Sequence, residues 1–541
     1  MIRDLELLTA RSFDVVVVGG GVYGLTMAYD ATQRGLSVAL VERDDFGSGA
    51  SFNHLRTIHG GLRYLQSFDL SRARESVRER RTIARIAPHA VRPLPFALPL
   101  YRSLTRGKLA MRAGFLLDRL VAAGRNRGVP RSHRLRAGRV YSRSSAIQQF
   151  PGLKRQGLTG AAVWQDYLMI EPDRLTFAWA QAAAGHGAVL ANHVEAIEVV
   201  RDGANVAGVR AKDTLGRRDF DIRARVVVNA TGAAIDRLLA PIGCASKIPM
   251  IKPMNLVTTR DAGDEALGGR GPTGRNLFMV PWRERALFGT WESRQLCQPD
   301  DTDITEREVA DFMGELNHAF PALDLSFKDI TLVHRGIVPA AVHGNDVRLE
   351  GHDQIRDHAA DGAAGLITVA GVKYTTARAV AERVTDRLMS KLGREPVACR
   401  TATTILPGGG VRDVGLAIAE ARRDHDQGLP TDTIPHLIAA YGSQYRDVLD
   451  LADGRPGLKS RVAAGSPVIG AELVKAAKNE MAITLADVLI RRTPVGALGY
   501  PGDEAVARGA DLLAAECGWS VERKRSEIDA VKSFYSQPTG P

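Results

Sequence analysis

The sequence predicts an α/β protein in which a parallel-sheet layer is interleaved with a mixed or antiparallel sheet and followed by an α-helical C-terminal domain. Three observations lead to this prediction. A strand–turn–helix–strand pattern lies at the N-terminus, short apolar runs alternate with helical stretches up to residue 405, and strand-like alternation is missing from residue 411 onward. At 541 residues the chain is long for a single core, so we expect more than one domain, with ranges 1–405 and 411–541.

The N-terminal pattern begins with a short apolar run over Asp14–Val18, which is typical of a buried parallel strand. The run leads into the glycine-rich turn Gly19–Gly24, and a helical pattern follows until Gly35 stops it. Ser37–Val41 is a second apolar strand that ends at Glu42. Together these segments predict one complete βαβ unit.

Later elements are predicted in the same way. Further strands are expected over residues 188–190, 196–200, 225–228, 287–290 and 366–369. The segment 406–410 carries a proline and three glycines, which break both helix and strand, and it marks the expected domain boundary. Beyond it, helices are expected over residues 414–423, 433–441, 471–492 and 503–517.

The glycine spacing in the N-terminal turn predicts a Rossmann-type dinucleotide site. Gly19 allows the tight turn, Gly21 lets the backbone approach a pyrophosphate, and Gly24 lets helix and strand pack closely. The helix N-terminus offers N–H groups to the phosphates, and Glu42 is placed to accept a hydrogen bond from a ribose hydroxyl. FAD and NAD both fit this pattern. The extreme N-terminal position and a late strand ending in the Ala230–Gly232 turn favour FAD.

Composition points to an ordinary globular protein with 45% hydrophobic and 25% charged residues. The N-terminus lacks a secretory pattern, and no run has the roughly 18–20 apolar residues needed to span a bilayer. The four cysteines are far apart, so neither a disulfide framework nor a metal site is expected, and a reducing cytoplasm fits best.

The net charge of +11 is concentrated in residues 102–139, which hold eleven Lys or Arg residues and one acid. Within this stretch, Leu109, Leu116 and Leu120 share one helical face with other apolar residues, while Lys108 and Arg112 lie on another. This pattern is typical of a helix at a membrane surface. Nucleic-acid binding, a solvated face, packing on the core, and oligomerisation as a homodimer are the alternatives. The absence of interleaved aromatic residues argues against nucleic acid.

Several motifs closely resemble the FAD-dependent glycerol-3-phosphate dehydrogenase family, the membrane-associated kind that reduces quinone. The most specific is IHGGLRYL at residues 58–65; the others are residues 228–232, 280–282, 371–378, 406–409, 480–487 and 491–493. The resemblance implies an FAD domain, a substrate domain that caps the flavin, and a helical C-terminal domain. It implies oxidation of glycerol 3-phosphate to dihydroxyacetone phosphate, with electrons passed to quinone at the inner face of the cell membrane.

The residues expected to contact FAD belong to the glycine turn, the loop after it, or later segments that return to the cofactor. From the turn and by resemblance they are Gly19, Gly21, Val22, Tyr23, Gly24, Glu42, Arg43, Ser51, Arg56, His59, Gly60, Gly61, Val194, Ala230, Thr231, Gly232, Gly336, Gly371, Val372, Lys373, Tyr374 and Thr375. A cation such as Lys373 near the flavin would favour its reduced form.

Arg63, Tyr64 and Lys373 are expected to bind an anionic head group, because arginine suits bidentate phosphate recognition and a tyrosine hydroxyl adds a directional bond. His59, Arg335 and Lys373 are the expected catalytic residues. A base must remove the hydroxyl proton as hydride leaves the alcohol, and His334 is a further candidate for that base or for an orienting group.

Four departures from the family pattern predict a remodelled substrate pocket. Val338 stands where the family usually has an arginine aimed at the substrate, and Trp291 adds a bulky indole after Thr290. Val372 and Arg56 replace the usual glycine and lysine. The alternative donor is therefore an unphosphorylated alcohol, a hydroxy acid or an amine, and a flavoprotein scaffold or nucleic-acid-binding protein is the hypothesis from another class.

Overall fold

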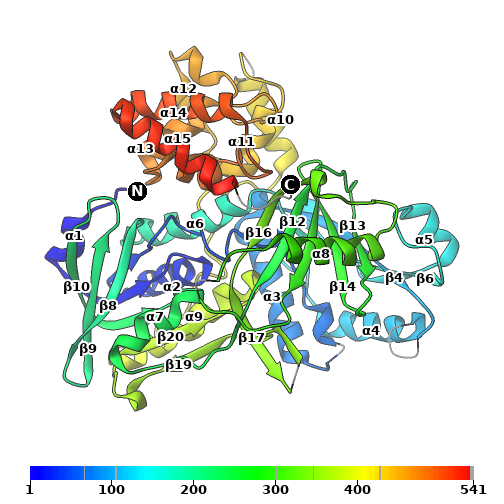
Figure 1. Cartoon of the computed structure of the whole chain (residues 1–541), viewed down its shortest axis with the longest axis horizontal. Coiled ribbons are helices and arrows are strands. Elements are labelled where there is room, and N and C mark those ends of the chain that lie inside the picture. Colours follow the sequence, from blue (N-terminus) through cyan, green and yellow to red (C-terminus); the bar gives the residue numbers. More distant parts are fainter. Residues whose placement is uncertain (66, 104–106, 300, 345, 426–427, 537–541) are drawn as a thin grey trace.

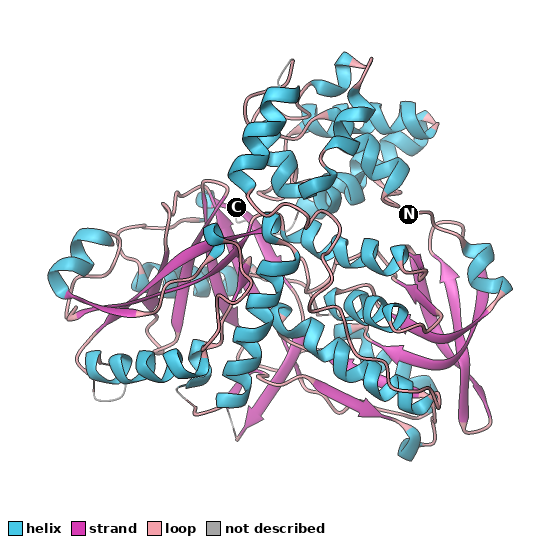
Figure 2. Cartoon of the chain, turned by 180° about the vertical axis from the view of Figure 1, so that it is seen from behind, coloured by secondary structure: helices cyan, strands magenta, loops and turns pink. Residues whose placement is uncertain are grey.

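The computed structural model describes residues 1–65, 67–103, 107–299, 301–344, 346–425 and 428–536. Two regions that contain the β-sheets lie side by side, and the C-terminal helices form a separate layer across them (Figures 1 and 2). All secondary-structure elements described from residue 414 onward are helices. The prediction of a mixed α/β protein with a helical C-terminal domain is confirmed.

The first sheet is built around β1 (Ser12–Val18), which runs parallel to β2 (Val38–Val41) on one side and β10 (Asp219–Asn229) on the other. All but the first residue of β1 are buried, as expected for a strand covered on both faces. The full order is β19-β20-β10-β1-β2-β7, with β8 and β9 paired beside β10. The remaining strands are β7 (Val189–Ala191), β8 (Val194–Asp202), β9 (Asn205–Asp213), β19 (Gln354–Asp357) and β20 (Leu366–Ala370).

The second sheet is mixed: its strands pair antiparallel except for β4 and β13, which are parallel. Its order is β16-β12-β15-β14-β13-β4-β6-β3, and β5 pairs with β6. The strands are β3 (Thr57–Ile58), β4 (Val91–Leu100), β5 (Arg139–Ser142), β6 (Gly160–Met169), β12 (Pro253–Thr258), β13 (Ala266–Arg270), β14 (Asn276–Trp282), β15 (Arg285–Glu292) and β16 (Ile330–Arg335). A third, small sheet joins β11 (Met250–Ile251), β17 (Val338–His343) and β18 (Asp346–Leu349).

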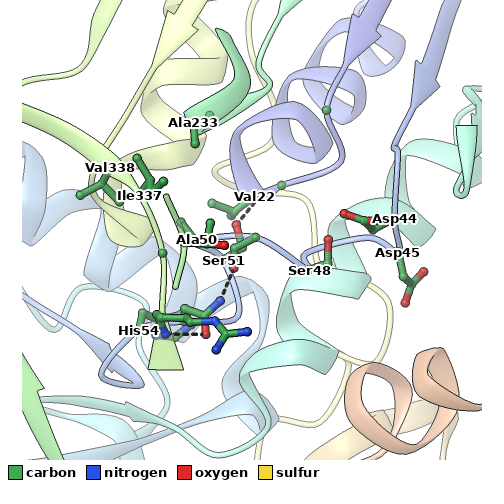
Figure 3. A pocket seen from close by; sticks show the side chains of 18 of the residues that line it. Val22, Asp44, Asp45, Ser48, Ala50, Ser51, His54, Ala233, Ile337 and Val338 are labelled. Carbon is green, nitrogen blue, oxygen red and sulfur yellow. Dashed lines mark hydrogen bonds between the residues drawn. The ribbon is translucent and has the colours of Figure 1, made fainter. Parts of the chain in front are cut away.

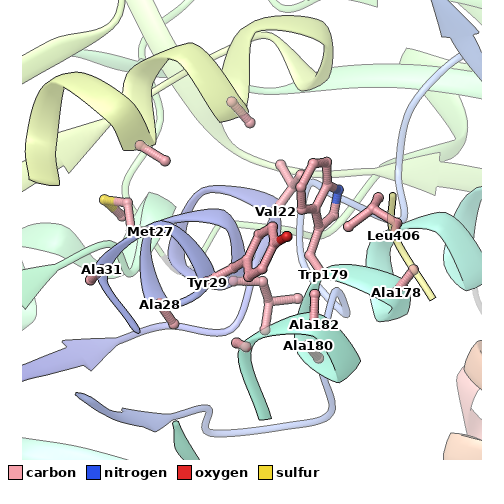
Figure 4. Packing of buried hydrophobic residues seen from close by; sticks show 14 of the residues in the cluster. Val22, Met27, Ala28, Tyr29, Ala31, Ala178, Trp179, Ala180, Ala182 and Leu406 are labelled. Carbon is pink, nitrogen blue, oxygen red and sulfur yellow. The ribbon is translucent and has the colours of Figure 1, made fainter. Parts of the chain in front are cut away.

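The helix predicted after the glycine turn is α2 (Val22–Gln33), and it packs against α6 (Pro172–Gly185) and α9 (Ala377–Lys391). Figure 4 shows the core between α2 and α6, where the rings of Tyr29 and Trp179 lie 5.9 Å apart. This apolar contact packs α2 against α6. Other helices before residue 400 are α1 (Leu5–Ala10), α3 (Leu70–Ile86), α4 (Lys108–Val121), α5 (Arg143–Gln149), α7 (Ile235–Leu239) and α8 (Glu306–Ala319).

The C-terminal helices include one correction. The single helix expected over residues 471–492 is two elements, because the backbone leaves helical geometry after Asn479 and Met481 adopts a left-handed conformation with φ of 57°. The chain becomes helical again as a π-helical turn over Asp487–Arg492. The helices are α10 (Val414–His425), α11 (Thr433–Tyr441), α12 (Arg446–Ala452), α13 (Gly470–Asn479), α14 (Asp503–Cys517) and α15 (Val521–Tyr535).

Buried ion pairs join the C-terminal helices to the first sheet region. The Arg174 guanidinium donates to both carboxylate oxygens of Glu480 at 2.5 and 2.9 Å, and Arg492 Nη2 donates to Asp45 Oδ1 at 2.8 Å. Each of these four side chains is at most 5% exposed. Loss of either partner would leave an unpaired charge in the interior, so the contact between the two regions is specific.

Candidate cofactor and substrate site

A cavity of about 890 Å³ lies at the carboxyl ends of the parallel strands. It opens where β1 is flanked by β2 and β10, which is the switch point at which doubly wound sheets bind ligands. Its size is within the range of small-molecule sites, roughly 300–1,000 Å³. The glycine turn, the loop over residues 42–55, the β16–β17 wall and the C-terminal helices all contribute to its lining (Figure 3).

The glycine turn can be built only from glycine at two of its positions. Gly19 has φ of +106°, and a Cβ there would lie 2.5 Å from the Ala230 carbonyl oxygen. A Cβ on Gly24 would lie 1.9 Å from the carbonyl oxygen of Gly19. The turn therefore holds β1, β10 and α2 close together, and Gly21 and Val22 place the N-terminus of α2 at the cavity.

Ser51 and Glu42 organise the backbone around this turn. The Val22 N–H donates to Ser51 Oγ at 2.9 Å. Glu42 accepts from the backbone N–H of Gly20 at 2.6 Å and of Asp44 at 2.9 Å. Burial raises the pKa of Glu42 to about 7, although both hydrogen bonds act in the opposite direction. Glu42 is thus both a cavity residue and the group that fixes the loop after β2.

The segment over residues 371–375 closes the cavity from the side of β20. Gly371, Val372 and Tyr374 line it. The Tyr23 hydroxyl donates to the Lys373 carbonyl at 2.9 Å, and the Lys373 N–H donates back to the hydroxyl at 3.3 Å. This segment is therefore fastened to the first turn of α2.

The side chain of Lys373 points away from the cavity lining. Its Nζ donates to Ser76 Oγ at 2.9 Å and lies 4.2 Å from the centre of the Tyr64 ring. Tyr64 is only 7% exposed. Two of the three predicted head-group residues, Tyr64 and Lys373, therefore contact each other, and neither is among the residues that line the cavity. Arg63 belongs to the turn η1 (Leu62–Leu65), but its side chain is outside the described residues.

His334 and Arg335 precede Val338 in the chain and could each take over the role of the missing family arginine, but they lie differently in the wall formed by β16 and β17. Thr331, Leu332, Val333 and Arg335 of β16 line the cavity. His334 is not among them and is fully buried, and Arg56 Nη2 is 3.2 Å from its Nε2. Burial and the neighbouring Arg56 hold the pKa of His334 well below its usual range. Arg335 is thus the candidate that reaches the cavity, and His334 is a neutral core residue.

An apolar face stands where the family arginine was expected. Val338 and Ile337 line the cavity beside Ala50 and Ala233 (Figure 3). The prediction that the Trp291 indole lies in the pocket was wrong. Trp291 is 8% exposed and packs into the hydrophobic core, while its neighbour Thr290 lines the cavity. Strand alternation explains the difference, because adjacent residues of β15 point to opposite faces.

Several predicted cofactor residues stand behind the cavity wall. Arg56 is fully buried, where it donates to the Phe52 carbonyl at 2.6 Å and lies 4.9 Å from the Trp282 ring. The Val194 N–H donates to the Glu42 carbonyl at 2.8 Å and so does not face the cavity. The preceding residue, His193, lines the cavity. Gly24, His59, Gly60, Gly61 and Thr375 also lie outside the lining.

The cavity has further lining residues that the sequence analysis did not identify. His54 stacks near Tyr374 with ring centres 5.3 Å apart, and burial holds its pKa well below the usual value. The C-terminal helices contribute Thr484, Ala486, Asp487, Ile490, Arg491, Phe534 and Tyr535. These residues are more than 400 positions from the glycine turn, and no spacing rule connects them to it. The motifs at residues 480–487 and 491–493 were the available signals.

Comparison with known proteins agrees with this geometry. The family described as FAD dependent oxidoreductase matches residues 14–387, and the C-terminal domain of alpha-glycerophosphate oxidase matches residues 399–524. A glycerol-3-phosphate dehydrogenase of Synechocystis is 30% identical over 99% of this chain and 98% of its own length. Glycerol-3-phosphate dehydrogenase 2 of Mycobacterium bovis is 32% identical over 98% of this chain and 88% of its own.

The chain belongs to the FAD-dependent glycerol-3-phosphate dehydrogenase family. Its fold also matches the structure of the glycerol-3-phosphate dehydrogenase from Bacillus halodurans in complex with FAD, with a TM-score of 0.78, 24% identity, and coverage of 99% of this chain and 97% of that one. The chain is therefore an FAD-dependent oxidoreductase of this family. The prediction of FAD as the cofactor is confirmed.

The basic stretch of this family member contains the exposed helix α4. Leu109, Leu116 and Leu120 are 78%, 62% and 72% exposed, while Phe115 on the opposite side is buried. The amphipathic helix is thus present, and its leucine side faces outward, not onto the core. Within the described part of the chain, no helix combines the length and the hydrophobicity needed to cross a membrane.

Proposed function

We propose that the protein oxidises glycerol 3-phosphate, or a closely related polyol phosphate, to the corresponding ketone. The observation that carries this proposal is the single cavity that joins the dinucleotide turn to the wall containing Arg335. Relatives named glycerol-3-phosphate dehydrogenases match it along nearly the whole chain. For glycerol 3-phosphate the product would be dihydroxyacetone phosphate.

The fit of FAD is supported by features of this chain. The glycine turn leaves no room for a side chain at Gly19 or Gly24, and the α2 N-terminus faces the cavity. We propose that Gly19, Gly21 and Ser51 hold the pyrophosphate and that Glu42 binds a ribose hydroxyl. The turns over residues 230–232 and 371–375 would contact the rest of the cofactor. Bound FAD supplies the acceptor for the hydride that the alcohol loses.

The substrate's anionic group is assigned to Arg335, because its side chain is on the cavity face of β16. Burial lowers its pKa, yet a guanidinium remains charged at any physiological pH. Arg63, Tyr64 and Lys373 are proposed as a second anchor for the head group. His59 is proposed as the base that takes the hydroxyl proton.

A second candidate function is favoured by the apolar face around Val338. Without an arginine there, a donor that carries an uncharged group would fit beside Ile337 and Ala233. Such a donor would be an unphosphorylated alcohol, a hydroxy acid or an amine.

Anaerobic reduction of the bound flavin, followed at 450 nm, separates the two functions. Glycerol 3-phosphate and longer polyol phosphates should bleach the flavin, whereas glycerol and the matching unphosphorylated polyols should not. Bleaching by the unphosphorylated donors alone would overturn the first proposal.

We also propose that α4 rests on an anionic membrane surface and that quinone is the electron acceptor there. Three exposed leucines and the cations at Lys108, Arg112 and Arg119 support this docking. Flotation with vesicles of anionic phospholipid tests it. The paired change L116D and L120D should release the protein, while D511N on exposed helix α14 should not. Equal retention of both variants would contradict the proposal.

A further inference from the structure

We propose that Asp166 is a positioning residue that orients His59 and selects which ring nitrogen accepts the substrate's proton. This inference rests on the proposed function, because it concerns the base of the same alcohol oxidation. It adds a residue that lies 107 positions from His59 in the sequence and that the IHGGLRYL motif does not contain.

Sheet register brings the two residues together. Strand β3 pairs antiparallel with β6 so that Thr57 is opposite Leu168 and Ile58 is opposite Tyr167. Continuing this register by one residue places His59 beside Asp166. The Phe96 ring, 5.9 Å from the imidazole, supports the His59 ring from β4. The antiparallel pairing of β3 with β6 thus determines the backbone positions of both His59 and Asp166.

Both ring nitrogens of His59 have a partner in this arrangement. Nδ1 lies 3.5 Å from Asp166 Oδ2, and Nε2 lies 2.6 Å from Thr57 Oγ1. An ionised carboxylate can only accept, so the neutral imidazole carries its proton on Nδ1. The unprotonated nitrogen is then Nε2, whose lone pair accepts from the Thr57 hydroxyl. The His59 side chain is 44% exposed, and a substrate hydroxyl that bound here would replace the Thr57 hydroxyl at Nε2.

Asp166 is itself held in one place. Its Oδ1 accepts from the Gly60 N–H at 2.7 Å and from the Arg80 guanidinium, and its Oδ2 accepts from the Trp164 indole N–H at 3.1 Å. The Asp166 side chain is 4% exposed. Burial alone would raise the pKa of this carboxyl, but Arg80 and His59 outweigh it and lower the pKa to about 2. Asp166 therefore remains an anion throughout the working pH range.

Only glycine fits at position 60, where the loop passes close to Arg80. A Cβ at Gly60 would lie 2.1 Å from Arg80 Nη1, so the backbone passes directly over the guanidinium. The His59 N–H also donates to Thr375 Oγ1 at 3.3 Å, which ties the loop to the 371–375 segment that lines the cofactor cavity. The Asp166–His59 pair is thus connected to the 371–375 segment through this one hydrogen bond from the His59 backbone.

The chemistry follows from this order of groups. The substrate's O–H bond breaks as Nε2 takes the proton, and the carbinol C–H bond releases its electron pair with hydrogen as hydride to bound FAD, leaving a C=O bond. The imidazolium that forms carries its new charge beside Asp166, which stabilises it. The charged and titratable groups around His59 are Asp166, Arg80 behind the carboxylate, His54 on the same loop, and Lys373 on the segment that contacts its backbone.

The first experiment uses Asp166→Asn, with Trp164→Phe as the matched control because it removes another hydrogen bond to the same oxygen without contacting His59. We expect the rate of flavin reduction to fall about 100-fold in D166N and no more than about tenfold in W164F. Equal losses in both variants would overturn the proposal.

The second experiment does not need an active substrate. The ¹⁵N chemical shifts of the His59 ring in the holoprotein, assigned by comparison with His59→Asn, report its tautomer. A proton on Nδ1 is expected, and a proton on Nε2 would overturn the inference. If no polyol phosphate reduces the flavin while Nδ1 is protonated, the proposed substrate is wrong and the positioning role survives.

Discussion

Gly371→Ala is the change that most directly tests how the cofactor cavity is built. A Cβ at this position would lie 2.0 Å from Tyr23 Cζ and 2.3 Å from its hydroxyl oxygen. The Tyr23 ring cannot simply rotate away, because its hydroxyl is bonded to both the carbonyl and the N–H of Lys373. Overpacking of this kind costs about 1–3 kcal/mol, and each weakened hydrogen bond adds about 1 kcal/mol.

Because Tyr23 and Gly371 both line the cavity, we expect much of this cost to fall on the FAD-bound state. The dissociation constant of FAD should rise about 10- to 100-fold, equivalent to about 1.4–2.8 kcal/mol. Flavin content after purification and quenching of flavin fluorescence on titration measure it. Gly314→Ala on α8 is the matched control, since a Cβ there meets nothing within 4 Å and the residue does not line the cavity. Unchanged FAD affinity in G371A, or equal loss in G314A, would refute the reasoning.

Three further predictions concern charged groups. Arg335→Met should raise the KM for glycerol 3-phosphate about 10- to 100-fold, because a hydrogen bond to a charged group contributes about 1.5–3 kcal/mol; unchanged steady-state KM would contradict its assignment. Arg492→Met leaves Asp45 buried without its partner and should lower the free energy of unfolding by about 3–5 kcal/mol, measured by urea denaturation; the double variant with Asp45→Asn should recover part of the loss. His436 is buried, which disfavours its charge, yet Glu472 and Glu171 raise its pKa to about 9. Its stabilisation is therefore complete below its ordinary pKa of about 6.5 and lost as pH rises through 9; the Tm difference between wild type and His436→Gln should shrink over that interval, and a constant difference would argue against it.

The βαβ unit was predictable because its signals are local. Four residues, Gly19, Gly21, Gly24 and Glu42, determine a turn, a close contact and a strand end within one short segment. The helix break near Met481 was not predictable, since the apolar pattern continues through it and only tertiary contacts favour the left-handed backbone. The division between residues 405 and 411 stays a prediction.

The site shows the same contrast. Strand periodicity could have ranked Arg335 above His334, but only once the cavity face of β16 was known. The link between His59 and Asp166 depends on the pairing of β3 with β6, and the register of two strands about 100 residues apart has no local signal. The C-terminal side chains at the cavity, such as Asp487 and Arg491, likewise depend on how the helical layer docks.

The central claim is that this FAD-dependent enzyme takes hydride from a polyol phosphate. The most direct measurement is an anaerobic titration of the holoprotein with glycerol 3-phosphate, with the 450 nm absorbance and the product quantified together. The account predicts loss of the flavin absorbance with one dihydroxyacetone phosphate formed per flavin. A flavin that stays oxidised under excess glycerol 3-phosphate and under the related polyol phosphates would contradict it.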